Sequence, residues 1–111
     1  MTDPEQLVFA ALADPTRREI IQILCADGDQ TATDLARRFP ISRQGIAKHL
    51  GILADAHLVS TRRAGRETIY SLNPTPLDET TAWVQSINAA WDKRLRALQA
   101  YLLAETEDET D

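Results

Sequence analysis

The sequence predicts a mostly helical domain that carries one two-stranded β-hairpin before its last helix. Three observations predict this fold class. Over most of the chain, apolar residues recur every three to four positions, which is the period of an amphipathic helix. Between residues 58 and 72 this period gives way to two short runs rich in β-branched residues. Proline, glycine or a helix-capping residue stands at the boundaries between these segments.

Two helices are expected in the first third of the chain. Residues 5–13 form the first, since their apolar positions fall at helical spacing. Asp14 and Pro15 open the second, because a carboxylate accepts from the free N–H groups of a first turn and proline needs no N–H there. Residues 27–29, with a central glycine, end it. Its inward stripe is Ile20, Ile21 and Leu24.

Two further helices follow in close succession. Thr31 and Asp34 form a near capping box, with aspartate in place of the usual Glu or Gln, and open a short helix over residues 32–38. A proline then breaks the helical run. Ser42 caps a fourth helix over residues 43–55. The inward stripe of the fourth helix is Ile46, Leu50 and Leu53.

The β-hairpin is predicted by residues 58–62 and 68–72, with Gly65 at a tight tip between them. An isolated hairpin is marginally stable in water, so this one must pack on the helices. Tyr70 and Leu72 share one face of the second strand and are the expected anchors.

The last helix is expected from Leu77 to about residue 104, and it carries a near-heptad apolar stripe. Residues 105–111 hold five acids and no base, which is typical of a disordered tail. The sequence therefore predicts one domain over residues 1–104, followed by an acidic tail.

The net charge of -5 is unevenly distributed along the chain. The acidic tail accounts for all of it. Residues 35–73 carry seven bases against two acids, a local net charge of +5. Phosphate binding depends on this local field and not on the charge of the whole chain. A merely solvated cationic face is the alternative interpretation.

Two short helices followed by a basic hairpin define a winged helix-turn-helix. The first residues of the helix over residues 43–55 then meet base edges in the major groove, where Arg43 suits guanine and Gln44 suits adenine. Hydroxyl, lysine and hairpin arginine side chains suit phosphates, although edge-strand charges also protect against aggregation. The predicted DNA-binding set is Thr31, Thr33, Ser42, Arg43, Gln44, Ala47, Lys48, Arg62, Arg63 and Arg66.

Gly45 lies within this recognition helix, where glycine costs about 1 kcal/mol relative to alanine. Close approach of the backbone to DNA would explain it, and neutral drift at a tolerant site is the alternative.

The last helix is expected to form a homodimer, because it carries more apolar surface than a small monomer easily hides. A two-fold dimer would read an inverted repeat. Packing of the stripe within one chain is the alternative. The predicted dimerisation set is Leu7, Trp83, Val84, Ile87, Trp91, Leu95, Leu98 and Leu102.

Two runs resemble the ArsR/SmtB (arsenic-repressor) family. Residues 11–20 read ALADPTRREI and residues 42–53 read SRQGIAKHLGIL, which resemble its second helix and its recognition helix. The resemblance covers about residues 7–104. It implies an autonomous homodimeric repressor that binds operator DNA and is usually released by an inducer.

The inducer sites of the family do not carry over. Residues 31–35 read TATDL where arsenic sensors have a cysteine pair, and residues 76–104 hold no histidine where zinc sensors have ligands. The Trp83 and Trp91 pair resembles a metal-independent branch, which implies an unidentified organic effector or none. We therefore expect neither metal nor cofactor.

The remaining reactive residues are read as structural. Cys25 is expected to be a buried thiol, His49 a packed or capping side chain, and His57 a cap after the fourth helix. No catalytic motif is present, so we expect no enzyme. The lone cysteine and the lack of a signal peptide predict a cytoplasmic protein without a membrane segment. A winged helix that binds only proteins is the alternative to a DNA-binding regulator.

Overall fold

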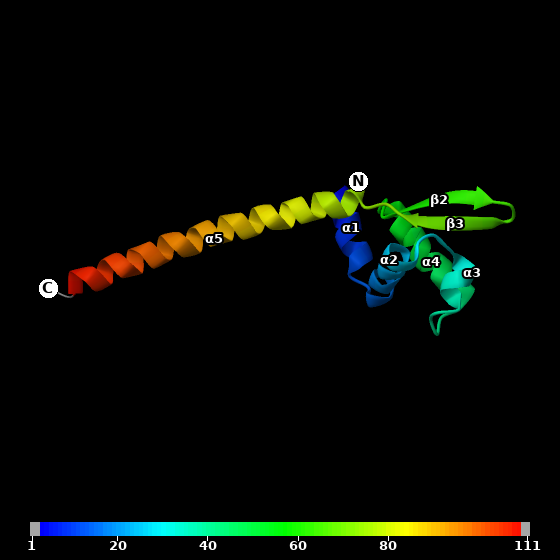
Figure 1. The fold of residues 1–111 in the computed structure, drawn as a ribbon, viewed down its shortest axis with the longest axis horizontal. Helices are drawn as coiled ribbons and strands as arrows, with labels where there is room; N and C mark the ends of the chain where they lie inside the picture. The colour runs from blue at the N-terminus through cyan, green and yellow to red at the C-terminus, as the bar shows by residue number, and fades with distance from the viewer. Residues whose placement is uncertain (1–2, 110–111) are drawn as a thin grey trace. The chain divides into compact units, whose positions relative to one another are not determined.

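The structure is a computed structural model that describes residues 3–109. The chain divides into two compact units, an N-terminal unit (Met1–Asp78) and a C-terminal unit (Glu79–Asp111). All five expected helices and both hairpin strands are present, and β1 is an additional short strand (Figure 1). The elements are α1 (Pro4–Leu12), α2 (Pro15–Asp27), β1 (Gln30–Thr31), α3 (Ala32–Ala36), α4 (Arg43–Asp55), β2 (Val59–Ala64), β3 (Glu67–Leu72) and α5 (Thr75–Glu109).

The expected helix boundaries of α2 and α4 are confirmed by their caps. Asp14 Oδ1 accepts from the N–H of Thr16 at 2.8 Å and from that of Arg17 at 3.2 Å. Partial burial pushes the pKa of Asp14 up, but these backbone hydrogen bonds outweigh it and hold the pKa below its usual value. Ser42 Oγ accepts from the N–H of Gly45 at 3.1 Å. Gly28 ends α2 with a φ of 83°, a backbone conformation that favours glycine.

The capping box at the start of α3 forms as expected. The N–H of Asp34 donates to Thr31 Oγ1 at 3.0 Å, and the N–H of Thr31 donates to Asp34 Oδ2 at 3.1 Å. The hydrogen bonds from Thr31 hold the pKa of Asp34 below its usual value. Asp34 therefore completes the capping box at a position where the longer Glu or Gln is usual. The helix ends at Ala36, two residues earlier than expected.

Arginines from α2 close the preceding helix. Arg17 Nε donates to the carbonyl of Ala11 at 2.7 Å, and Arg18 Nη1 donates to that of Leu12 at 2.6 Å. Carbonyls at a helix C-terminus lack partners within the helix. Arg17 and Arg18 thus provide hydrogen-bond donors for the free carbonyls at the end of α1, and they fix the corner between α1 and α2.

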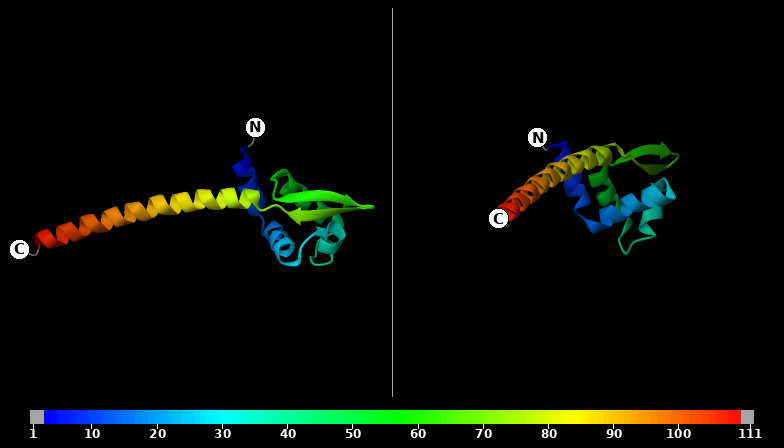
Figure 2. Two further views of the ribbon diagram at one scale, coloured as in Figure 1. Left: turned by 45° about the horizontal axis from the view of Figure 1, so that its top comes forward. Right: turned by 60° about the vertical axis from the view of Figure 1, so that its left-hand side comes forward.

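The sheet has three antiparallel strands in the order β1-β3-β2. Ala64 pairs with Glu67 and Val59 with Leu72, so the strands extend further toward the tip than expected. Gly65 is the first of the two turn residues, with a φ of 65°, as a type II′ turn requires. The hairpin projects from the helices (Figure 2). We name the segment Val59–Leu72 the wing.

The core of the N-terminal unit is aliphatic and dry. No buried residue of the described chain is polar or charged. Tyr70 and Leu72 pack against this core, so the expected anchors of the hairpin are confirmed. The buried residues are Val8, Ala11, Ile20, Leu24, Leu35, Ile46, Leu50, Leu53, Ala56, Leu58 and Val59.

The end of α4 is held by a residue in a left-handed conformation. His57 has a φ of 60°, and its carbonyl accepts from Asn73 Nδ2 at 2.8 Å. This conformation ends helices, and histidine adopts it more readily than most residues. The expected cap after the fourth helix is confirmed.

Two expectations are corrected by the structure. Cys25 is exposed, not buried, because one step along a helix turns the side chain about 100° away from the buried Leu24. The last helix runs to Glu109, so residues 105–109 of the expected disordered tail are helical. Glutamate favours helix and elongation is easy once a helix exists. Tyr101 Oη also donates to Glu105 Oε1 at 3.0 Å, one turn on. Residues 110–111 of that tail lie outside the described part of the chain.

Candidate nucleic-acid interface

The exposed side of α4 carries the residues expected to meet DNA. Ser42, Arg43, Gln44, Ala47 and Lys48 are all exposed, whereas Ile46 and Leu50 of the same helix are fully buried. Ser42 Oγ accepts from the N–H of Gly45, which leaves its hydroxyl proton free to donate to a phosphate. The exposed side of the first turn of α4 therefore presents hydrogen-bond donors, and the apolar residues of the helix lie on its other side.

A groove of about 430 Å³ lies between the start of α3, the first turns of α4 and the wing. Six of the ten residues predicted to bind DNA line it, although they come from separate parts of the chain. Four further residues complete the lining. The six are Thr31, Thr33, Arg43, Ala47, Arg63 and Arg66, and the other four are Ala32, Glu67, Thr68 and Tyr70.

The three arginines of this groove keep their charges unpaired. Among the described residues, the ion pairs formed by arginine are Arg17 with Asp14, Arg38 with Asp27 and Arg62 with Asp29. Those of the groove form none, even though a glutamate also lines it. Converging unpaired guanidinium groups create a positive potential in a concave site, which suits an anion.

Arg62 is not brought together with the groove residues. Its Nη2 donates to Asp29 Oδ2 at 3.1 Å, and it is absent from the groove lining that includes its neighbour Arg63. Successive residues of a strand point to opposite faces of a sheet. The wing thus separates two arginines that are adjacent in the sequence.

Ser42, Gln44 and Lys48 lie on the exposed side of α4 beside the groove but do not line it. Sequence reasoning missed Thr68 and Tyr70 as groove residues. The signal was present, because a two-residue turn after Ala64 sets Thr68 opposite Arg63, and the period of two then sets Tyr70 on the same face.

Gly45 has a reason that neither sequence interpretation supplied. A Cβ at this position would lie 2.6 Å from Ile41 Cγ2. The glycine therefore makes room for the residue just before the helix cap.

The histidines do not assemble a metal site in the described part of the chain, which holds no group of three or more metal-ligating side chains. His49 is half-buried, and its Nδ1 lies 3.3 Å from Arg17 Nη1. Because arginine can only donate, Nδ1 is the acceptor in this contact. The expectation of a packed histidine is confirmed.

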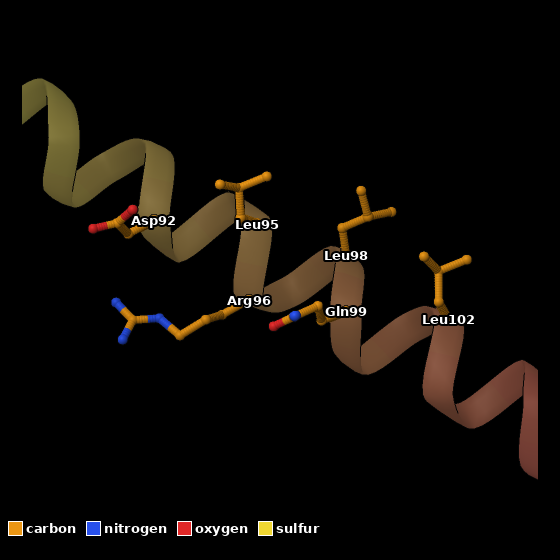
Figure 3. Close-up of a pocket in the computed structure, with 6 residues that line it drawn as sticks. All are labelled: Asp92, Leu95, Arg96, Leu98, Gln99 and Leu102. Atoms are coloured by element: carbon orange, nitrogen blue, oxygen red, sulfur yellow. The ribbon is translucent and has the colours of Figure 1, made fainter.

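The apolar side chains of the C-terminal unit lie on α5. Its large apolar side chains from Trp83 to Leu103 are between 41% and 66% exposed. Leu95, Leu98 and Leu102 project from one side of the helix and line a shallow groove with three polar neighbours (Figure 3). Leu7, the remaining member of the predicted dimerisation set, is half-buried against the core of the N-terminal unit. None of the helices in the described range is long and apolar enough to cross a membrane.

Two helices in succession, the second exposed and basic, beside a wing that shares a cationic groove with it, define a winged helix-turn-helix protein of the DNA-binding class. Residues 12–62 match a family model described as a helix-turn-helix domain. The transcriptional repressor SdpR of Bacillus subtilis is 46% identical over 77 residues, which cover 69% of this chain and 84% of that protein.

An arsenical resistance operon repressor of Staphylococcus xylosus is 34% identical, over 75% of this chain and 79% of its own length. The solved structure of an ArsR-like transcriptional regulator from Rhodococcus sp. RHA1 superposes with a TM-score of 0.83 at 42% identity, covering 91% of this chain and 92% of that one. The chain belongs to the ArsR family of winged helix-turn-helix transcriptional regulators.

Proposed function

We propose that this chain is a cytoplasmic, homodimeric repressor that binds an inverted-repeat operator. One observation carries the proposal: unpaired arginines from α4, from β2 and from the turn of the wing line one groove. A DNA backbone that passes along this groove would meet cations from two directions. The first turn of α4 would then face the base edges in the major groove.

The proposed division of labour follows from position and chemistry. Arg43 and Gln44 lie at the exposed start of α4, where a recognition helix meets bases, and both side chains can form two hydrogen bonds to one purine. Arg63, Arg66 and the hydroxyls of Thr31 and Thr33 fit phosphate contacts. Ser42 and Lys48 add donors at the edge of this surface, and Ala47 leaves room for a base edge or a thymine methyl group.

The proposed dimer rests on α5. A single helix that exposes two tryptophans and a row of leucines would leave a large apolar patch in water. A second copy offers an identical face, and a two-fold axis would then pair two recognition helices with the two halves of an inverted repeat. Half-sites about one helical turn apart are expected.

The experiment selects binding sites from a random duplex pool and then compares affinities over a salt series. Replacing both Arg63 and Arg66 with alanine should weaken all duplexes alike and reduce the slope of log affinity against log salt by about two per protomer. Arg43→Ala should instead lose about 1–3 kcal/mol on the selected site and relax the preference at one base pair. Recovery of no enriched sequence, together with an unchanged salt slope, would overturn the proposal.

A further inference from the structure

The two adjacent arginines of β2 lie in different surroundings. Arg63 pairs across the hairpin with Thr68, and both line the cationic groove. Arg62 pairs with Ile69, and its guanidinium is bound to Asp29. Neighbouring strand residues face opposite sides of the sheet, so the Arg62 side chain points away from that of Arg63, and Arg62 does not line the groove.

The Arg62–Asp29 contact spans the whole width of the sheet. Arg62 belongs to β2, at one edge, and Asp29 immediately precedes β1, at the other edge. The row of paired residues runs from Arg62 through Ile69 to Thr31, two residues beyond Asp29. The ion pair therefore crosses β3 and joins the wing to the turn between α2 and α3.

The pairing of β1 with β3 at this junction is short. β1 contributes only two residues to the sheet, Gln30 paired with Tyr70 and Thr31 paired with Ile69. Thr31 is also the cap of α3 and lines the groove. Any rotation of the wing about β1 would change the spacing between the arginines of the wing and the start of α4.

We propose that Arg62 and Asp29 are positioning residues, which set the angle of the wing and so keep Arg63 and Arg66 opposite Arg43. This inference rests on the proposed DNA-binding function and divides the wing arginines by role. Asp29 neutralises Arg62, so Arg62 contributes no counterion release when DNA binds. Both side chains are partly exposed, 57% for Arg62 and 44% for Asp29, so their contact is weak and acts on wing geometry more than on folding.

The test compares five proteins on one selected duplex over a salt series: the unaltered chain, Arg62→Ala, Asp29→Ala, the exchanged pair Arg62→Asp with Asp29→Arg, and Arg63→Ala as the matched control. Arg62→Ala is expected to weaken binding about two- to fivefold with an unchanged salt slope, as for an exposed pair. Arg63→Ala should reduce the slope by about one per protomer. The exchanged pair keeps the total charge and should restore the affinity lost in Arg62→Ala.

The opposite pattern would overturn the inference. If Arg62 binds a phosphate, Arg62→Ala will lower the slope as Arg63→Ala does, Asp29→Ala will strengthen binding, and the exchanged pair will bind worst of all. Absence of binding by the unaltered chain would overturn the proposed function instead. Amide exchange then decides the positioning role. Arg62→Ala and Asp29→Ala must speed exchange at Gln30, Ile69 and Tyr70, which pair across β1 and β3, and unchanged rates there would exclude the role.

Discussion

Gly45→Ala is predicted to destabilise the N-terminal unit, although alanine is the best helix former. Gly45 lies in the first turn of α4, where an added Cβ would stand 2.6 Å from Ile41 Cγ2 and 3.4 Å from Ser42 Oγ. Carbon atoms in optimal contact are about 3.5–4.0 Å apart. One of the two groups must therefore move by roughly 1 Å.

The magnitude follows from two opposing contributions. Alanine gains about 1 kcal/mol of helix propensity over glycine. Ile41 Cγ2 is bonded directly to Cβ, so it can yield only by a change of the stiff χ1 angle or by a backbone shift. Overpacking of this kind costs about 1–3 kcal/mol. We expect a net loss of about 1 kcal/mol, which lowers Tm by about 4–8 °C in a domain of this size.

Thermal unfolding followed by circular dichroism provides the assay, and Gly51→Ala provides the control. Gly51 lies in the same helix, but an added Cβ there meets nothing within 4 Å, so Tm should rise. In an Ile41→Ala background the Gly45→Ala change should also become stabilising, because the opposing methyl group is gone. An equal rise of Tm for Gly45→Ala and Gly51→Ala would refute the steric argument.

Two further predictions concern the dimer and acid stability. Leu95→Glu places a carboxylate in the apolar row of α5 and should yield monomers in sedimentation equilibrium. Gln99→Glu adds the same charge beside the row and should leave the dimer intact. If both variants were monomeric, or both dimeric, the apolar row would not be the interface. Asp14 and Asp34 have depressed pKa values in the folded chain, so the stability that they add is complete above their ordinary value of 3.8 and is lost as the pH falls through the lower folded values. Asp14→Asn keeps the cap at neutral pH and should flatten this acid dependence in urea unfolding; an unaltered dependence would show that the carboxylate charge does not contribute.

Short-range features were the ones that sequence reasoning predicted well. The caps at Asp14, Thr31 and Ser42 depend on atoms within three residues, and all three form. Helix periodicity likewise separated the exposed Arg43 from the buried Ile46. These choices need no knowledge of the rest of the chain.

Long-range features were missed for a physical reason. β1 has only two residues, and it exists as a strand because β3 pairs with it some forty residues later in the chain. The Arg62–Asp29 pair depends on the same register. Gly45 was explained by close approach to DNA or by neutral drift, and both interpretations missed the approach of Ile41, which depends on how the chain enters α4. Cys25 was placed inside the molecule because its helix stripe was taken to be one step wider than it is.

The placement of the aromatic side chains has a spectroscopic consequence. Both tryptophans of the chain, Trp83 and Trp91, belong to α5, and the aliphatic core of the N-terminal unit holds none. Each indole is about half exposed, 46% and 57%. Intrinsic tryptophan emission thus reports the solvent environment of α5 and does not directly follow unfolding of the aliphatic core. A blue shift upon concentration would register self-association directly, without a label, while far-ultraviolet signals follow the rest of the fold.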